Sequence, residues 1–244
     1  MCTGKVYGAE ALIRWIHPEK GLIPPLDFLS FIEETKLEIE VGNWVINESF
    51  KQIDMWGKLD INLIVSINIS SLHLQCADFY MQVEQALARY PEVNSKQVQL
   101  EILESSVLSD ITLISGIIKK CQKELGISIA LDDFGTGYSS LTHLRRISAD
   151  TIKIDQTFIR DMLEDESDYA IVEGITALAK TFNREVIAEG VETMEHGIKL
   201  MALGCNYAQG YGIARPMPAE KIEQWLEEYE PYAEWSEFAS TVTA

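Results

Sequence analysis

The chain is poor in basic residues, in paired cysteines and in long apolar runs, and each shortage excludes a class of protein. Twenty lysines and arginines stand against 38 acidic residues, a net charge of −18, which excludes a basic nucleic-acid groove. The four cysteines form no CxxC pair, so we expect neither a disulfide framework nor a zinc site. No apolar run approaches the roughly 18 residues of a membrane helix. We therefore expect a cytoplasmic chain that does not insert into membranes, although missing segments could tether a longer parent protein.

What the sequence does contain is 244 residues, 47% of them hydrophobic, with strand-like and helix-like patterns in alternation. The expected extended segments are 6–14, 63–69, 97–102, 127–131, 151–154, 185–188 and 206–209. The expected helices are 26–35, 40–56, 79–90, 111–125, 139–146, 169–182, 194–203 and, last, 219–229. This alternation predicts an α/β fold with a mostly parallel sheet, and the length favours a TIM-like (β/α)8 barrel. We expect the barrel to occupy residues 1–228 and an acidic, aromatic tail to occupy 229–244, packed on the barrel or on a neighbour.

The most informative stretch is the apolar strand that precedes Asp132 and Asp133 and the glycine-rich turn after them. Two adjacent carboxylates repel each other, and burying either one without a partner is costly. A pair of this kind at the mouth of a buried strand usually needs a cation. Many such pairs are solvated loop residues, so the pair alone is weak evidence.

Other polar residues also fall at the C-terminal ends of expected strands, where the active sites of parallel barrels lie. Period-two alternation predicts that they converge; they are Glu10, Asn68, Glu101, Asp132, Asp133, Lys153, Glu189 and Gln209. Oxygen ligands without histidine or cysteine select Mg²⁺ or Mn²⁺. Five carboxylates around one lysine favour two ions, an arrangement suited to displacement at phosphorus.

Taken singly, several of these residues have simpler interpretations. Glu10 alone is more typical of an exposed acid at a strand edge, and Lys153 of a surface lysine. Asn68 could cap the helix that follows it, as could Ser70 and Ser71. The residues alone leave these alternatives open.

Taken in order, seven motifs resemble those of the EAL domain and cover nearly the whole chain. They are Glu10-Ala11-Leu12-Ile13-Arg14-Trp15, Asn68-Ile69-Ser70, Glu101-Ile102-Leu103-Glu104-Ser105, the run from Asp132 to Ser140, Lys153-Ile154-Asp155, the run from Ala188 to Thr193, and Gln209-Gly210-Tyr211. The resemblance implies a bacterial phosphodiesterase that uses Mg²⁺ or Mn²⁺ to hydrolyse cyclic di-GMP to linear pGpG.

The resemblance also implies a role for each matching residue. Glu10, Asn68, Glu101 and Asp132 match ligands of a first metal ion, while Asp132, Asp133 and Glu189 match the surroundings of a second. Lys153 matches the residue that orients the attacking water, and Gln209 a position contacting water, metal or substrate. Arg14, which alternation places on the face of Glu10, and Leu12 match the substrate-binding region. Glu104 matches the residue that steadies the loop from Phe134 to Ser140.

The chain departs from the family pattern in a few places. Leu103 replaces a threonine beside Glu101 and Glu104, and Ile13 replaces a leucine. The family's first N-terminal strand is missing, so we expect a fragment of a longer protein in which sensory or GGDEF-type domains could be present. A homodimer is left open. Two rival functions are a catalytically silent cyclic di-GMP receptor and an unrelated Mg²⁺-dependent barrel enzyme.

Overall fold

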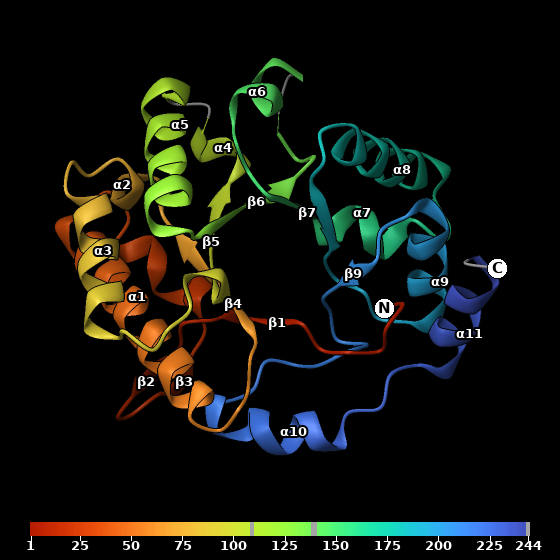
Figure 1. Cartoon of the computed structure of the whole chain (residues 1–244), viewed down its shortest axis with the longest axis horizontal. Helices are drawn as coiled ribbons and strands as arrows, with labels where there is room; N and C mark the ends of the chain where they lie inside the picture. The colour runs from red at the N-terminus through yellow and green to blue at the C-terminus, as the bar shows by residue number, and fades with distance from the viewer. Residues whose placement is uncertain (108–109, 138–140, 243–244) are drawn as a thin grey trace. The chain divides into compact units, whose positions relative to one another are not determined.

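The computed structural model describes residues 1–107, 110–137 and 141–242, and the chain forms two compact units (Figure 1). One unit is Gly8–Ile129, and the other combines Met1–Tyr7 with Ala130–Ala244. Across the described residues, no helix has both the length and the apolar character needed to span a bilayer.

The unit Gly8–Ile129 is built on three parallel strands, β1 (Gly8–Ala11), β4 (Ile64–Ile69) and β5 (Val98–Leu103). Its helices are α1 (Lys36–Gly57), α2 (Ser71–Leu74), α3 (Phe79–Arg89), α4 (Glu104–Val107) and α5 (Ile111–Lys120), the last continued by a π turn, η4 (Cys121–Leu125). Helix α1 packs on β4 and α3, and its Phe50 side chain is fully buried. Ser70, and not Asn68, caps α2, since its hydroxyl accepts a hydrogen bond from the His73 amide at 3.3 Å.

The second unit contains most of β6 (Ser128–Phe134), followed in parallel by β7 (Thr151–Ile154), β8 (Glu185–Ala188) and β9 (Tyr207–Ala208). Its helices are α6 (Leu141–Arg146), α7 (Gln156–Asp161), α8 (Glu166–Thr181), α9 (Met194–Leu203), η5 (Ala219–Lys221), α10 (Ile222–Glu228) and α11 (Ala233–Val242). Helix α8 packs on β7 and β8, where Ile152, Ile154 and Val172 have no exposed surface. The predicted alternation of strands and helices is confirmed.

The predicted helix 26–35 is wrong. This segment forms two short 3₁₀ turns, η1 (Pro25–Asp27) and η2 (Leu29–Phe31). Leu26 is 90% exposed and Phe31 81% exposed, so the apolar spacing that suggested a helix buries no face. Without tertiary packing an isolated helix of this length is marginal, and the two prolines before Leu26 favour a turn.

The predicted extended segment 6–14 is shorter in the structure, because β1 ends at Ala11. A hairpin that the sequence analysis missed follows it, formed by β2 (Trp15–His17) and β3 (Gly21–Ile23). Gly21 has a φ of +72°, a backbone conformation that glycine adopts without cost. The alternation used to place Arg14 on the face of Glu10 therefore does not extend to Arg14.

The chain has one helix more at its C-terminus than expected. Helix α10 covers most of the predicted last helix, but α11 follows it within the predicted tail. Figure 1 shows α11 beside α9, and the two helices are in contact. The tail thus packs on its own chain, which was one of the two alternatives.

Arg184 connects the start of β8 to the segment that follows α6. Its guanidinium donates hydrogen bonds to the carbonyl oxygens of Leu144 (2.7 Å) and Ala149 (2.9 Å) and also to that of Ile147. These carbonyls lie at or beyond the end of α6, where no helical N–H is available to them. Arg184 therefore holds the connection between β6 and β7, the two strands that carry Asp132 and Lys153.

Replacing Arg184 with methionine should lower the free energy of unfolding by about 2–3 kcal/mol, because three carbonyls lose a charged donor. Urea denaturation of the variant and the parent chain measures the difference. Arg160→Met is the matched control, since the Arg160 side chain is 62% exposed. An unfolding free energy for Arg184→Met equal to that of the control would show that these hydrogen bonds add nothing to stability.

Candidate active site

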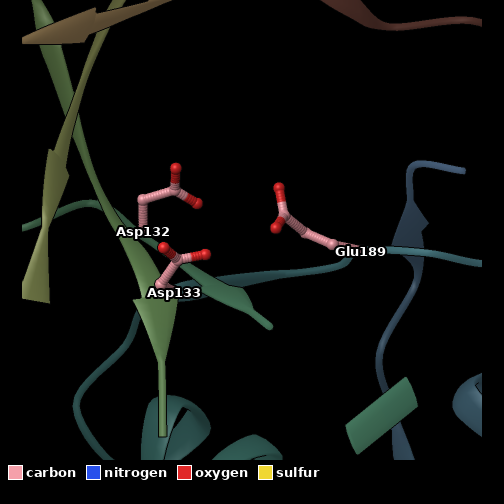
Figure 2. Close-up of side chains that lie close together, drawn as sticks. All are labelled: Asp132, Asp133 and Glu189. Atoms are coloured by element: carbon pink, nitrogen blue, oxygen red, sulfur yellow. The ribbon is translucent and has the colours of Figure 1, made fainter. Parts of the chain in front are cut away.

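The site in the second unit begins at Asp132 and Asp133, which lie inside β6 and not after it as predicted. Neighbouring side chains on a regular strand point to opposite faces. Here the register with β7 shifts between Leu131 and Phe134, and Asp133 has a φ of +52°. Such an irregularity redirects a side chain, and aspartate tolerates the left-handed conformation better than most residues. Both carboxyl groups consequently lie on the same side of the strand as Glu189 (Figure 2).

Lys153 forms ion pairs with two residues of this group, Asp132 and Glu189. It projects from β7, only 1% of its side chain is exposed, and its Nζ lies 3.2 Å from Asp132 Oδ1 and 2.7 Å from Glu189 Oε1. A buried ammonium group is costly unless carboxylates accompany it, and two do so here. The simpler interpretation of Lys153 as a surface lysine is wrong.

Asp133 has a neighbour that the sequence analysis did not assign to the site, Asp155. The pKa of the Asp133 carboxyl is raised to about 6, mainly by burial and also by the adjacent Asp132 carboxylate and a hydrogen bond with Asp155, against the opposing effect of Lys153. Asp155 also accepts a hydrogen bond from the Thr157 amide at 2.8 Å, which caps α7. Asp155 lies two residues after Lys153, and strand alternation places such residues on the same face, so this spacing was the signal that could have identified Asp155.

Glu189 directly follows β8, and the backbone around it is closely held. Its amide donates to Ile154 O at 3.1 Å, and two residues later the Val191 amide donates to Gln209 O at 3.0 Å. The Gln209 amide in turn donates to Ala188 O at 2.8 Å. The structure therefore brings Gln209 beside the Glu189 segment through its backbone, as the strand-end argument predicted.

A second polar group lies in the unit Gly8–Ile129. Asn68 Nδ2 donates to Glu10 Oε1 at 2.6 Å, and Asn68 is the register partner of Glu101 in the parallel pair of β4 and β5. Glu101 is only 1% exposed, which is unusual for a carboxylate. The structure thus brings these three predicted ligands to neighbouring strands. Glu10 is half-buried rather than exposed, and it is hydrogen-bonded to Asn68.

The remaining predicted residues are less organised. Arg14 lies outside any strand, and its Nη1 donates to Ile13 O at 2.8 Å. Leu12 is 39% exposed just after β1. Glu104 begins α4 and is 3% exposed, so it is a buried acid as a positioning role requires. Part of the loop it was predicted to steady, residues 138–140, lies outside the described residues.

The carboxylates of the second unit fit a divalent cation. One oxygen each from Asp132, Asp133 and Glu189 lies within 4.8 Å of the other two, the only such cluster found in the part of the chain that the structure describes. Three carboxylates and one ammonium leave an excess of negative charge, and the charge of Asp132 adds to the effect of burial in raising the pKa of Asp133. Oxygen donors of this type select hard cations such as Mg²⁺ and Mn²⁺.

The family model for the EAL domain matches residues 1–216. The chain belongs to the EAL family. A solved structure of the PaMucR phosphodiesterase in complex with c-di-GMP is 40% identical and superimposes with a TM-score of 0.82 over 88% of this chain and 87% of that one. The EAL domain of DcpA from Mycobacterium smegmatis is 31% identical, with a TM-score of 0.80 over 93% and 94% of the two chains. The predicted TIM-like α/β barrel is confirmed by these EAL structures.

Curated relatives of this EAL chain are longer proteins. It is 40% identical over 228 residues to the cyclic di-GMP phosphodiesterase PdeR of Escherichia coli strain K12, covering 93% of this chain and 34% of PdeR. It is 41% identical over 223 residues to the bifunctional diguanylate cyclase/cyclic di-GMP phosphodiesterase MucR of Pseudomonas aeruginosa, covering 90% and 32%. The EAL chain thus spans about a third of the length of these relatives.

Proposed function

We propose that this EAL chain is a divalent-metal-dependent phosphodiesterase that hydrolyses cyclic di-GMP to linear pGpG. The proposal is supported by relatives about 40% identical that bear this activity in their names, and by a 40% identical structure holding c-di-GMP. The names of these relatives describe the activity of the relatives. For the present chain, the inference of the same activity depends on its own residues.

The observation that carries the proposal is the buried Lys153 between Asp132 and Glu189, inside a cluster of carboxylates. Burying one cation among several carboxylates adds little to stability compared with an apolar core. Such arrangements are concentrated at catalytic sites, where charge must be placed before the substrate arrives.

We assign Asp132, Asp133 and Glu189 to divalent-cation binding, and Glu10, Asn68 and Glu101 to a further ligand set, so that two Mg²⁺ or Mn²⁺ ions serve as cofactors. Bound ions of this kind neutralise charge on the phosphate and lower the pKa of water. The chain itself supplies oxygen ligands of both types, carboxylate and amide. The Asn68 hydrogen bond holds Glu10 in one orientation, which reduces the entropy lost on binding a cation.

The other site residues act on the substrate and the attacking water. The Lys153 ammonium group has three N–H donors, and its Nζ lies beside the carboxylates of Asp132 and Glu189. Its role here is to donate to the water oxygen and orient the water toward phosphorus. Arg14 pairs with a phosphate oxygen after giving up its contact with Ile13 O. Leu12 and Gln209 border the substrate, and Glu104 holds the loop after Phe134. A homodimer, further domains and a cytoplasmic location remain predictions.

The decisive experiment is incubation of the purified chain with cyclic di-GMP and Mn²⁺, followed by chromatography of the nucleotides. We expect pGpG to appear with Mn²⁺ or Mg²⁺ and to be absent after treatment with EDTA. Ca²⁺ should inhibit, since its longer bonds and looser coordination suit an octahedral site poorly. If Mn²⁺-loaded protein binds cyclic di-GMP without cleaving it, the chain is a receptor and not an enzyme. If it does not bind cyclic di-GMP, both proposals are wrong.

A further inference from the structure

We propose that Trp235, in the helix beyond the family-matched residues, is a positioning residue for Glu189. The family model ends at residue 216, whereas Trp235 lies in α11. It is nevertheless 1% exposed and belongs to the largest fully buried side chains of the described residues. This inference rests on the proposed function, because Glu189 is the group whose position would matter for hydrolysis.

Trp235 is anchored to α9 by a hydrogen bond and by close ring packing. Its indole Nε1 donates to Met194 O at 2.9 Å, and Met194 is the first residue of α9. The Tyr232 ring packs edge-on against the indole, with ring centroids 4.9 Å apart. A tryptophan buried with its N–H satisfied has one defined orientation, so the contact fixes α11 relative to the start of α9.

Gly197 of α9 provides the space for this contact. A Cβ atom at that position would lie 2.3 Å from both Cε2 and Nε1 of Trp235, far closer than non-bonded atoms can approach. Glycine is a poor residue for the interior of a helix, so its presence there needs a reason. The close approach of the indole supplies one: a glycine inside the family-matched region accommodates a tryptophan outside it.

The first turn of α9 is joined to Glu189 by a short segment. Only Gly190, Val191, Glu192 and Thr193 separate Glu189 from Met194. Hydrogen bonds to Ile154 and Gln209 hold the start and middle of this segment, and its end is the Thr193 cap of α9. Trp235 is bonded to the residue that directly follows this cap.

A second contact ties the same turn of α9 to α7. His196 Nδ1 is hydrogen-bonded to Thr193 Oγ1 at 3.0 Å. On the other side of the ring, His196 Nε2 is hydrogen-bonded to Arg160 O in α7 at 3.3 Å. Helix α7 begins three residues after Lys153. The first turn of α9 is therefore hydrogen-bonded to both α7 and α11, and removing Trp235 removes the hydrogen bond to α11.

The position of Glu189 has chemical consequences because its ion pair with Lys153 is short, 2.7 Å between Oε1 and Nζ. Displacements near 1 Å, even when caused far from the reacting atoms, can cost on the order of 100-fold in rate. Loss of Trp235 should therefore lower the turnover number and the cation affinity more than the affinity for substrate. A purely structural tryptophan would change only the melting temperature.

We would compare Trp235→Phe and Trp235→Ala with Trp225→Ala, a matched control in α10 whose half-buried ring packs on Tyr229. The measurements are melting temperature, kcat and KM at a temperature where every variant is folded, Mn²⁺ affinity by calorimetry without substrate, and hydrogen exchange of the amides 189–197. The phenylalanine variant keeps the ring and loses the donor, so it tests the proposal even if the alanine variant does not fold.

We expect Trp235→Ala to lower kcat and Mn²⁺ affinity about 10-fold, with KM changed less than about three-fold and with faster exchange at 189–197. Trp235→Phe should show the same pattern at about three-fold, and Trp225→Ala should match the parent chain. Unchanged kcat, Mn²⁺ affinity and exchange in Trp235→Phe, with a lower melting temperature alone, would overturn the positioning role. If the parent chain does not cleave cyclic di-GMP, the proposed function fails, while Mn²⁺ affinity and exchange still decide the role of Trp235.

Discussion

Replacing Lys153 with methionine should lower kcat for cyclic di-GMP by about 10²–10⁴-fold while changing the Kd for the substrate only a few-fold. Methionine has nearly the length of lysine and fills the same buried space, but it cannot donate a hydrogen bond to water or pair with Asp132 and Glu189. Single-turnover hydrolysis and calorimetric binding of cyclic di-GMP separate the two quantities.

The control for this variant is Lys180→Met, the same change at an exposed position near the end of α8. It should retain the kcat and Kd of the parent chain. A Lys153→Met variant that kept most of its kcat would show that Lys153 only balances the charge of the carboxylates. Equal losses of kcat and substrate affinity would place Lys153 among the binding residues.

Replacing Asp132 with asparagine should abolish detectable hydrolysis and weaken Mn²⁺ binding by at least about 10-fold. The change keeps the size of the side chain but removes a charge that faces both the cation cluster and Lys153. It also leaves Lys153 with one carboxylate partner fewer, and breaking a buried ion pair costs about 3–5 kcal/mol. Calorimetry with Mn²⁺ and nucleotide chromatography measure the two effects.

Asp161→Asn is the matched control, since the Asp161 side chain is 52% exposed and pairs with its neighbour Arg160, away from the cation cluster in sequence. The control should change neither activity nor Mn²⁺ affinity. Full Mn²⁺ affinity in Asp132→Asn would contradict the assignment of this carboxylate as a ligand, whatever the effect on hydrolysis.

The sequence predicted the site best where regular strands carry it. Lys153 lies in an unbroken strand, so alternation placed it correctly. Arg14 was placed by the same rule and wrongly, because β1 ends three residues before it and a hairpin follows. Period-two reasoning holds only as far as the strand extends, and the end of a strand depends on partners that are distant in the sequence.

Other features depend on conformations or contacts that a pattern does not contain. The left-handed backbone of Asp133 brings two adjacent carboxylates to one side of β6, whereas alternation would separate them. The exposed residues Leu26 and Phe31 mimicked a helical face although nothing packs over them in the described residues. The packing of Trp235 against Gly197 brings together residues 38 positions apart in the sequence, and no local sequence pattern predicts it.

The backbone conformation of Asp133 bears on how an EAL chain could change its function. Glycine and asparagine also adopt left-handed backbone readily, so either could replace Asp133 without straining β6 while removing a carboxylate. Loss of the Lys153 ammonium group instead leaves the buried Asp132 carboxylate and the half-buried Glu189 carboxylate without their cation. In an EAL chain that evolves from hydrolysing its ligand to only binding it, substitution at position 133 should therefore destabilise the fold less than substitution at position 153.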